Sequence, residues 1–191
     1  MDKPLYLFVG RSGSGKSTIA DMFEGLYDMK QVSSYTTRPM RHENEKGHVF
    51  ISDEAFDELK EIVAYTEYNQ YRYCATREQV DEASIYVIDV PGVETLLEKY
   101  HSERPIVIVY FNASVRVRID RMMHRHDSDS AIVSRIYNDE EFEWSNQLKK
   151  IVWNYKNNLD RDVDMCIIDA DKDIVQVSIQ VKECMAERQE L

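Results

Sequence analysis

The chain has 191 residues, of which 43% are hydrophobic and 31% charged, and its net charge is −11. These values are typical of one folded domain with a sizeable core, and they exclude a disordered chain or two ordinary domains. The acidic balance argues against a nucleic-acid or anionic-membrane partner, and no apolar run approaches the length that crosses a bilayer.

The first predicted element is a strand at residues 5–9, which leads into a glycine-rich loop and an amphipathic helix. The loop has the spacing of a phosphate-binding loop. Its residues are Gly10, Arg11, Ser12, Gly13, Ser14, Gly15, Lys16, Ser17 and Thr18. Glycines let the backbone N–H groups turn toward a polyphosphate, and the helix dipole favours the same anion. Lys16 is therefore expected to reach the outer phosphates of ATP, and the Ser17 hydroxyl to ligate magnesium.

Residues 34–75 interrupt the regular alternation of strands and helices. A short strand is expected at 31–35, and a short helix begins after Ser52, which is the predicted N-cap. The stretch 63–73 is strand-like, with a predicted turn at residues 69–70.

Two arginines in this segment form a candidate second phosphate site. Arg38 and Arg41 lie three residues apart beside hydroxyl side chains such as that of Ser34. Two guanidinium groups can bind a phosphate dianion through paired hydrogen bonds, which a lysine cannot do. The alternative is a solvated basic turn.

The second half of the chain returns to alternating elements. Strands are predicted at 85–90, 106–111 and 165–168, and helices at 93–100, 114–125 and 174–185. A long helical segment is predicted at 132–155, either continuous or interrupted. This alternation predicts an α/β fold with a mainly parallel sheet and helices on both faces. The stretch 125–134, rich in Asp and Ser, is expected to be mobile, and Arg116 and Arg118 before it can be solvated side chains.

Two further expectations concern single residues. Asp89 ends a buried strand, and a buried carboxylate there favours a magnesium or arginine partner over a helix-capping role. Cys74, Cys166 and Cys184 are widely spaced and include no CxxC pair, so free thiols in a reducing cytoplasm are expected.

Taken with the phosphate loop upstream, the segment 34–41 resembles the nucleoside-monophosphate site of the guanylate kinase family. Further resemblances lie at Glu43, 47–52, 71–76 and 88–92, and Arg121, Arg125 and Arg135 fall where that family has its lid arginines. The resemblance implies a P-loop NTPase three-layer fold in a single domain, residues 1–191. It divides this domain into a core (1–33, 76–124 and 136–191), an acceptor-binding insertion (34–75) and a mobile lid (125–135).

The resemblance also implies residue roles. The implied catalytic residues are Lys16, Arg38, Arg125 and Arg135. The implied acceptor contacts are Ser34, Arg38, Arg41, Glu43, His48, Tyr73 and Asp89. Magnesium, which accompanies ATP, would be held by Ser17 and Asp89. A phosphate acceptor is largely dianionic at neutral pH, with a second pKa of about 6, so no general base is required.

The chain departs from the family where guanine is read. The family places a glutamate about nine residues before the second tyrosine of its Tyr-Tyr-Gly turn, and a serine or threonine two residues after that tyrosine. Counted from Tyr73, those positions are Ala64 and Ala75, which cannot form side-chain hydrogen bonds. Glu67 lies nearby, at a spacing that does not match. The phosphate site is kept while base reading is altered.

The predicted function is ATP-dependent phosphoryl transfer to a nucleoside monophosphate, with GMP or dGMP first on family grounds and another nucleotide second. A kinase of a phosphorylated sugar, such as ribose 1,5-bisphosphate, is the nearest alternative. A guanylate-kinase-like module that binds a protein ligand without catalysis is the alternative from another class. The protein is expected to be cytoplasmic, a monomer or homodimer, with no nucleic-acid or membrane partner.

Overall fold

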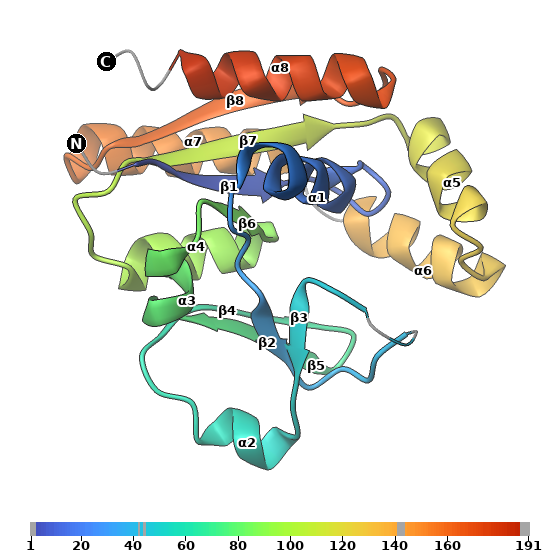
Figure 1. The fold of residues 1–191 in the computed structure, drawn as a ribbon, viewed down its shortest axis with the longest axis horizontal. Helices are drawn as coiled ribbons and strands as arrows, with labels where there is room; N and C mark the ends of the chain where they lie inside the picture. Colours follow the sequence, from blue (N-terminus) through green and yellow to red (C-terminus); the bar gives the residue numbers. More distant parts are fainter. Residues whose placement is uncertain (1–2, 42, 44, 141–143, 188–191) are drawn as a thin grey trace.

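The central element of the computed structural model, which describes residues 3–41, 43, 45–140 and 144–187, is a four-stranded parallel sheet. Its strands lie side by side in the order β6 (Ile85–Val87), β1 (Leu5–Val9), β7 (Ile106–Asn112) and β8 (Val163–Asp169) (Figure 1). All four strands were predicted, although β6 ends earlier than expected. Because the strands are parallel, their carboxyl ends meet at one edge, where open α/β sheets bind ligands.

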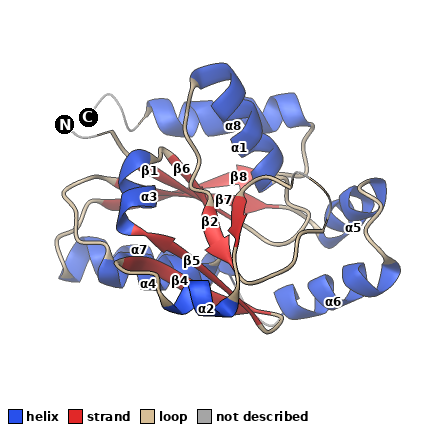
Figure 2. Ribbon diagram, turned by 60° about the horizontal axis from the view of Figure 1, so that its bottom comes forward, coloured by secondary structure: helices blue, strands red, loops and turns tan. Residues whose placement is uncertain are grey.

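Helices cover both faces of this sheet (Figure 2). On one face lie α1 (Lys16–Tyr27) and α8 (Ile174–Ala186), and on the other α4 (Val90–Lys99) and α7 (Trp144–Asn158). Strand β1 is buried throughout: its odd-numbered residues join the cluster with α4 and α7, and its even-numbered ones the cluster with α1 and α8. Since successive side chains of a strand point to opposite faces, a continuous apolar run is what a doubly covered strand requires. The predicted three-layer α/β architecture is confirmed.

The insertion forms a second, smaller sheet below the first (Figure 1). Its order is β3 (His48–Phe50), β2 (Ser34–Thr36), β5 (Tyr71–Thr76) and β4 (Ile62–Tyr68), and it is joined by α2 (Asp53–Asp57) and followed by α3 (Arg77–Glu82). The Ser52 hydroxyl accepts a hydrogen bond from the Ala55 amide, which confirms the predicted N-cap. Asn69 and Gln70 have φ values of 50° and 66°, as a two-residue hairpin turn demands.

Two helices connect β7 to α7. They are α5 (Val115–His124) and α6 (Asp129–Glu140), which pack against each other. The helical segment expected over 132–155, for which an interruption was left open, is two helices, and residues 141–143 between them lie outside the described residues. Helix α6 runs through position 135, the expected boundary between lid and core, so that boundary does not coincide with the end of an element. Within the described ranges, no helix is both long and apolar enough to span a bilayer.

The prediction of three free thiols is wrong. Cys166 on β8 and Cys184 on α8 form a disulfide across a sequence separation of 18 residues, while Cys74 is free and buried. The helix α8 packs on β8, which brings together two cysteines that look unrelated in the sequence. The cysteine pattern thus no longer supports the expected cytoplasmic location, which stays a prediction.

Candidate functional site

The phosphate loop leaves the carboxyl end of β1 and runs into the first turn of α1. Gly13 and Gly15 have φ values of +79° and +95°, in the left-handed region that favours glycine. A Cβ on Gly13 would lie 2.7 Å from the carbonyl oxygen of Arg118, so the loop sits directly on α5. Arginine side chains of α5 bind the loop from that side: Arg118 Nε donates to the Ser12 carbonyl (2.9 Å) and Arg121 Nη1 to the Ser14 carbonyl (3.1 Å).

Lys16 lies at the start of α1 with its ammonium group turned back onto the loop. Its Nζ donates to the carbonyl of Gly10 (2.5 Å) and to that of Arg11 (3.1 Å). Burial lowers the pKa of Lys16 to about 8, and the charge of Arg118 adds to this, while Asp139 and Asp89 oppose it. Its hydrogen bonds hold the ammonium beside the loop, and no carboxylate of the described residues forms an ion pair with it, so it can bind an anion. Ser17 and Thr18 follow it as exposed residues of the first helical turn.

One cavity of about 410 Å³ joins the loop to the insertion. Its wall includes Gly10, Ser12 and Lys16 from the loop. From the insertion it includes Ser34, His48 and Tyr73, three of the predicted acceptor contacts. We call it the central cavity. Its volume is in the range of small-molecule sites.

A second cavity, of about 550 Å³, lies on the other side of the loop between α1 and α5. Its wall includes Gly13, Gly15 and Thr18 from the loop region, with Arg121 and Arg125 from α5 and its C-terminus. The phosphate loop therefore separates two cavities, one toward the insertion and one toward α5.

Ser34 and His48 are neighbours on the parallel strands β2 and β3. The Ser34 Oγ and His48 Nδ1 atoms are 2.9 Å apart. Burial, together with the nearby charge of Arg38, lowers the pKa of His48 to about 4. His48 is therefore neutral at pH 7 and faces the central cavity as a hydrogen-bonding group.

This shift predicts a pH-dependent stability. The unfolded chain binds a proton on His48 below pH 6.5, whereas the folded chain does so only near pH 4, so stability present above pH 6.5 is lost as the pH falls toward 4. The loss should be on the order of 3 kcal/mol at most. Urea unfolding of wild type and His48→Gln at pH 7 and pH 4 measures it as a change in their difference. A difference that does not vary with pH would contradict the lowered pKa.

Arg38 and Arg41 lie close to the central cavity but outside its wall. The Arg38 guanidinium is buried and donates to both carboxylate oxygens of Glu45, at 2.8 and 3.1 Å. Burial lowers the pKa of Arg38, but Glu45 and the neighbouring Tyr73 raise it by a larger amount, so the net shift is upward. Glu45 also accepts from the Arg41 amide (2.8 Å). The sequence analysis named Glu43 here, which is exposed. The residue whose carboxylate pairs with both arginines is Glu45, and no spacing in the sequence singles it out.

Arg125 and Arg135 meet at a single carboxylate. Both donate to Asp127 Oδ2, at 2.5 Å each. Burial raises the pKa of Asp127 and the two arginines lower it by more, so that it stays charged. Arg41 also interacts electrostatically with Arg135 and Asp127. The predicted acceptor arginine and the two predicted lid arginines are therefore neighbours, and Asp127 belongs to the stretch that was expected to be mobile.

Both carboxylate oxygens of Asp89 accept hydrogen bonds within the protein. Its Oδ1 accepts from the Gly92 amide (2.8 Å) as the N-cap of α4, and its Oδ2 accepts from the Thr66 hydroxyl (2.9 Å). Burial raises its pKa, which these hydrogen bonds and the charge of Lys16 partly offset. The capping role, which the sequence analysis ranked second, is thus the observed one. Asp89 nevertheless lies in the wall of the central cavity.

The two alanines at the expected base-reading positions are paired across β4 and β5 and are buried in the core. Neither Ala64 nor Ala75 lines the central cavity, whose wall on this side is formed by Thr66, Glu67 and Tyr68. Glu67, which the sequence spacing disfavoured, is therefore the acidic side chain that β4 presents to the cavity.

Within the described part of the chain, no cluster of three or more His, Cys, Asp or Glu side chains could hold a metal ion by itself. Magnesium usually keeps several waters and binds proteins through one or two oxygens together with substrate phosphates. Ser17, exposed on the first turn of α1, and Asp89, in the cavity wall, are oxygen donors of the kind that Mg²⁺ accepts.

Comparisons with known proteins bear on the fold. A scan against protein-family models finds no match, and a search of the curated proteins finds none either. Among solved structures, the crystal structure of guanylate kinase from Anaplasma phagocytophilum matches with a TM-score of 0.54 at 16% sequence identity. The match covers 98% of this chain and 87% of that chain. The chain therefore has a guanylate-kinase-like P-loop NTPase fold, with a central parallel sheet between two layers of helices.

Proposed function

We propose that this protein is an ATP-dependent kinase that transfers a phosphoryl group to a nucleoside monophosphate. One observation carries the proposal: the central cavity is lined both by Lys16 of the phosphate loop and by Ser34, His48 and Tyr73 of the insertion. Phosphoryl transfer needs two anionic groups held in line in one enclosed space, with positive charge around them. A loop for a polyphosphate and a polar pocket for an acceptor share such a space here.

The arginines around the cavity supply the charge that this reaction needs. Arg38 and Arg41 both interact electrostatically with Tyr73 of the cavity wall, and Arg41 also interacts with Arg135. In the proposed reaction Lys16 contacts the β- and γ-phosphates, Arg38 and Arg41 bind the acceptor phosphate, and Arg125 and Arg135 close over the transferred group. An acceptor dianion attacks the γ-phosphorus directly, so no general base is needed and catalysis consists of positioning and charge neutralisation.

Magnesium fits this site as a companion of ATP. Ser17 and Asp89 would hold it, directly or through water, and the ion would neutralise phosphate charge when bound. The second cavity, between α1 and α5, offers room for the nucleoside part of ATP on the other side of the loop.

The residues of the cavity wall on the β4 side bear on which base the acceptor carries. Ala64 and Ala75 are buried away from the cavity, so guanine would not be read at these two positions. Glu67 and the aromatic side chains of Tyr68, Tyr73 and Trp144 in the wall favour a planar base over a bare sugar phosphate. A nucleoside monophosphate whose base differs from guanine is thus compatible with the pocket.

An ADP-release assay tests the function directly. Purified protein with MgATP is offered each ribo- and deoxynucleoside monophosphate and ribose 1,5-bisphosphate in turn. We expect at least one nucleoside monophosphate to accelerate ADP release far above the acceptor-free rate. The sugar phosphate as the best acceptor would favour the alternative kinase, and no acceleration by any acceptor, without MgATP binding, would favour the non-catalytic module.

Binding of MgATP should be linked to proton uptake. With a pKa of about 8, Lys16 is uncharged in about half of the unliganded molecules at pH 8, and phosphates beside it raise that pKa. Binding at pH 8 should therefore take up about half a proton per site, against about a tenth at pH 7. Titration calorimetry in buffers of different ionisation enthalpy measures this uptake. Equal heats in all buffers at pH 8 would contradict the proposed contact.

A further inference from the structure

A buried ion pair connects α5 and α6 at the phosphate loop. Arg118 is 0% exposed and Asp139 4% exposed, and Arg118 Nη2 lies 2.6 Å from Asp139 Oδ2. The sequence analysis allowed Arg118 to be a solvated side chain. Its partner lies 21 residues later, on another helix. Taking two charges out of water is costly, so a pair retained in this place calls for a reason other than stability.

Both members of the pair bind the backbone of the same loop residue. The Ser12 amide donates to Asp139 Oδ2 at 2.8 Å, while Arg118 donates to the Ser12 carbonyl at 2.9 Å. Ser12 is thus fixed on its N–H and on its C=O by two charged side chains. Because the next residue, Gly13, rests on the α5 backbone, the conformation of the loop is tied to these two helices.

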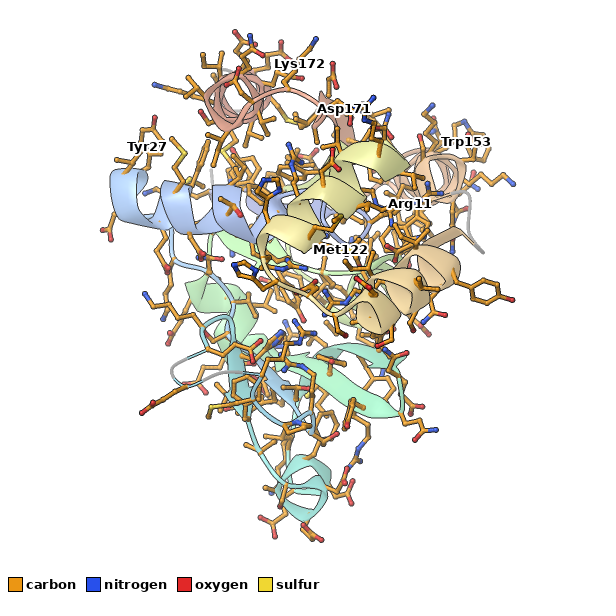
Figure 3. The ribbon with its side chains drawn as sticks, turned by 90° about the vertical axis from the view of Figure 1, so that its right-hand side faces the viewer. Arg11, Tyr27, Met122, Trp153, Asp171 and Lys172 are labelled. Atoms are coloured by element: carbon orange, nitrogen blue, oxygen red, sulfur yellow. A yellow bond between two sulfur atoms is a disulfide. The ribbon has the colours of Figure 1, made fainter. Side chains whose placement is uncertain are left out.

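The helix α6 that carries Asp139 also reaches the other parts of the site. Arg135 lies one turn earlier, on the same face of the helix, and binds Asp127. The neighbouring Asn138 donates to the side chain of Asn69 in the β4–β5 turn, at 3.4 Å. In Figure 3, α5 and α6 lie side by side in front of the sheet, with Arg11 of the loop beside them. One helix therefore contacts the phosphate loop, the lid arginines and the insertion.

We propose that Asp139 is a positioning residue that fixes the Ser12 amide and so couples the phosphate loop to the helix bearing Arg135. The inference rests on the proposed function. In the reaction, Asp139 touches no reacting atom. Its carboxylate holds the loop in the shape that receives the triphosphate and keeps Arg135 at a fixed distance from that loop.

Electrostatic attraction and loop positioning predict opposite changes in MgATP affinity when the Asp139 charge is removed. Lys16 is faced by Asp139, Arg118, Arg125 and Asp89. Removing the Asp139 charge makes this site more positive, so Coulomb attraction alone predicts tighter binding of the anionic nucleotide. If Asp139 positions the loop, MgATP should bind more weakly in any variant that lacks a hydrogen-bond acceptor for the Ser12 amide. A variant that keeps such an oxygen should bind MgATP as tightly as wild type or more tightly.

The experiment compares three variants by calorimetric titration with MgATP in the absence of acceptor, and by thermal unfolding. Asp139→Ala should bind MgATP at least tenfold more weakly than wild type. Asp139→Asn keeps an oxygen that accepts from the Ser12 amide and should bind at least as tightly as wild type. Arg118→Leu/Asp139→Ala removes both buried charges, so it should regain much of the lost thermal stability while remaining at least tenfold weaker.

Val181→Ala is the control, because Val181 is buried in α8 away from the loop and its truncation lowers the melting temperature by creating a cavity. It should leave MgATP affinity within twofold of wild type. Equal affinities for Asp139→Ala and Asp139→Asn, or a double variant that regains wild-type affinity, would overturn the inference. A wild type that binds MgATP but phosphorylates no acceptor would refute the proposed function alone, because the affinity comparison is unaffected.

Discussion

Replacing Lys16 by alanine should abolish phosphoryl transfer while leaving the fold intact. The Lys16 ammonium lines the central cavity from the phosphate loop, and among the described residues it donates to loop oxygens such as the Gly10 carbonyl. These contacts connect the loop to itself, so their loss should leave the rest of the described fold in place. Loss of a charge that stabilises the transferred phosphoryl group should lower kcat by about 10³-fold or more, equivalent to about 4 kcal/mol.

The measurement is a steady-state ADP-release assay with the best acceptor, paired with thermal unfolding of the apoprotein. Lys30→Ala is the matched control: Lys30 is an exposed lysine whose ion pair with Glu82 lies outside both cavities. It should keep kcat within twofold of wild type. Comparable activity in Lys16→Ala would remove the phosphate loop from the mechanism.

The features that the sequence predicted correctly are those encoded locally. Strand β1 is a run of five apolar residues, and the Ser52 cap and the turn at Asn69 and Gln70 each depend on neighbours within a few positions. The glycines of the phosphate loop are needed for backbone reasons that spacing alone reveals. Such features form from the segment's own residues whatever lies around it. The order of strands and helices, and with it the fold class, could therefore be predicted from the sequence.

The features that the sequence missed depend on partners brought together by the fold. Arg118 meets Asp139, and Cys166 meets Cys184, only after α6 and α8 have packed. Glu45 was overlooked in favour of Glu43 because nothing in the spacing shows which carboxylate a buried Arg38 will meet. These are the contacts that decide the charge balance of the site, so its residue types were predictable while its internal pairing was not.

Most of the arginines around the candidate site are paired with a carboxylate. Arg38 is held by Glu45, Arg125 and Arg135 by Asp127, and Arg118 by Asp139. An unpaired cluster of guanidinium groups would repel itself and unfold its segments, so each carboxylate stabilises a local concentration of positive charge within an acidic protein. A phosphate dianion carries more charge than a carboxylate and has more acceptor oxygens. It can therefore bind these arginines in place of their carboxylate partners without a change in the fold around them.

Arg38→Lys should lower kcat/KM for the acceptor by about 10²- to 10³-fold, which corresponds to about 3–4 kcal/mol. The affinity for MgATP should stay within twofold of wild type. Lysine keeps the charge but cannot donate to Glu45 and a phosphate through a planar fork. Arg72→Lys is the matched control, because Arg72 also pairs with carboxylates and lies over a phenylalanine ring. The Arg72 guanidinium binds Asp53 and Asp57 of α2, whereas that of Arg38 interacts with Tyr73 of the cavity wall. It should keep kcat/KM within twofold. Equal losses in both variants would mean that Arg38 only supports the insertion, whereas a loss confined to Arg38→Lys assigns its guanidinium to the acceptor phosphate.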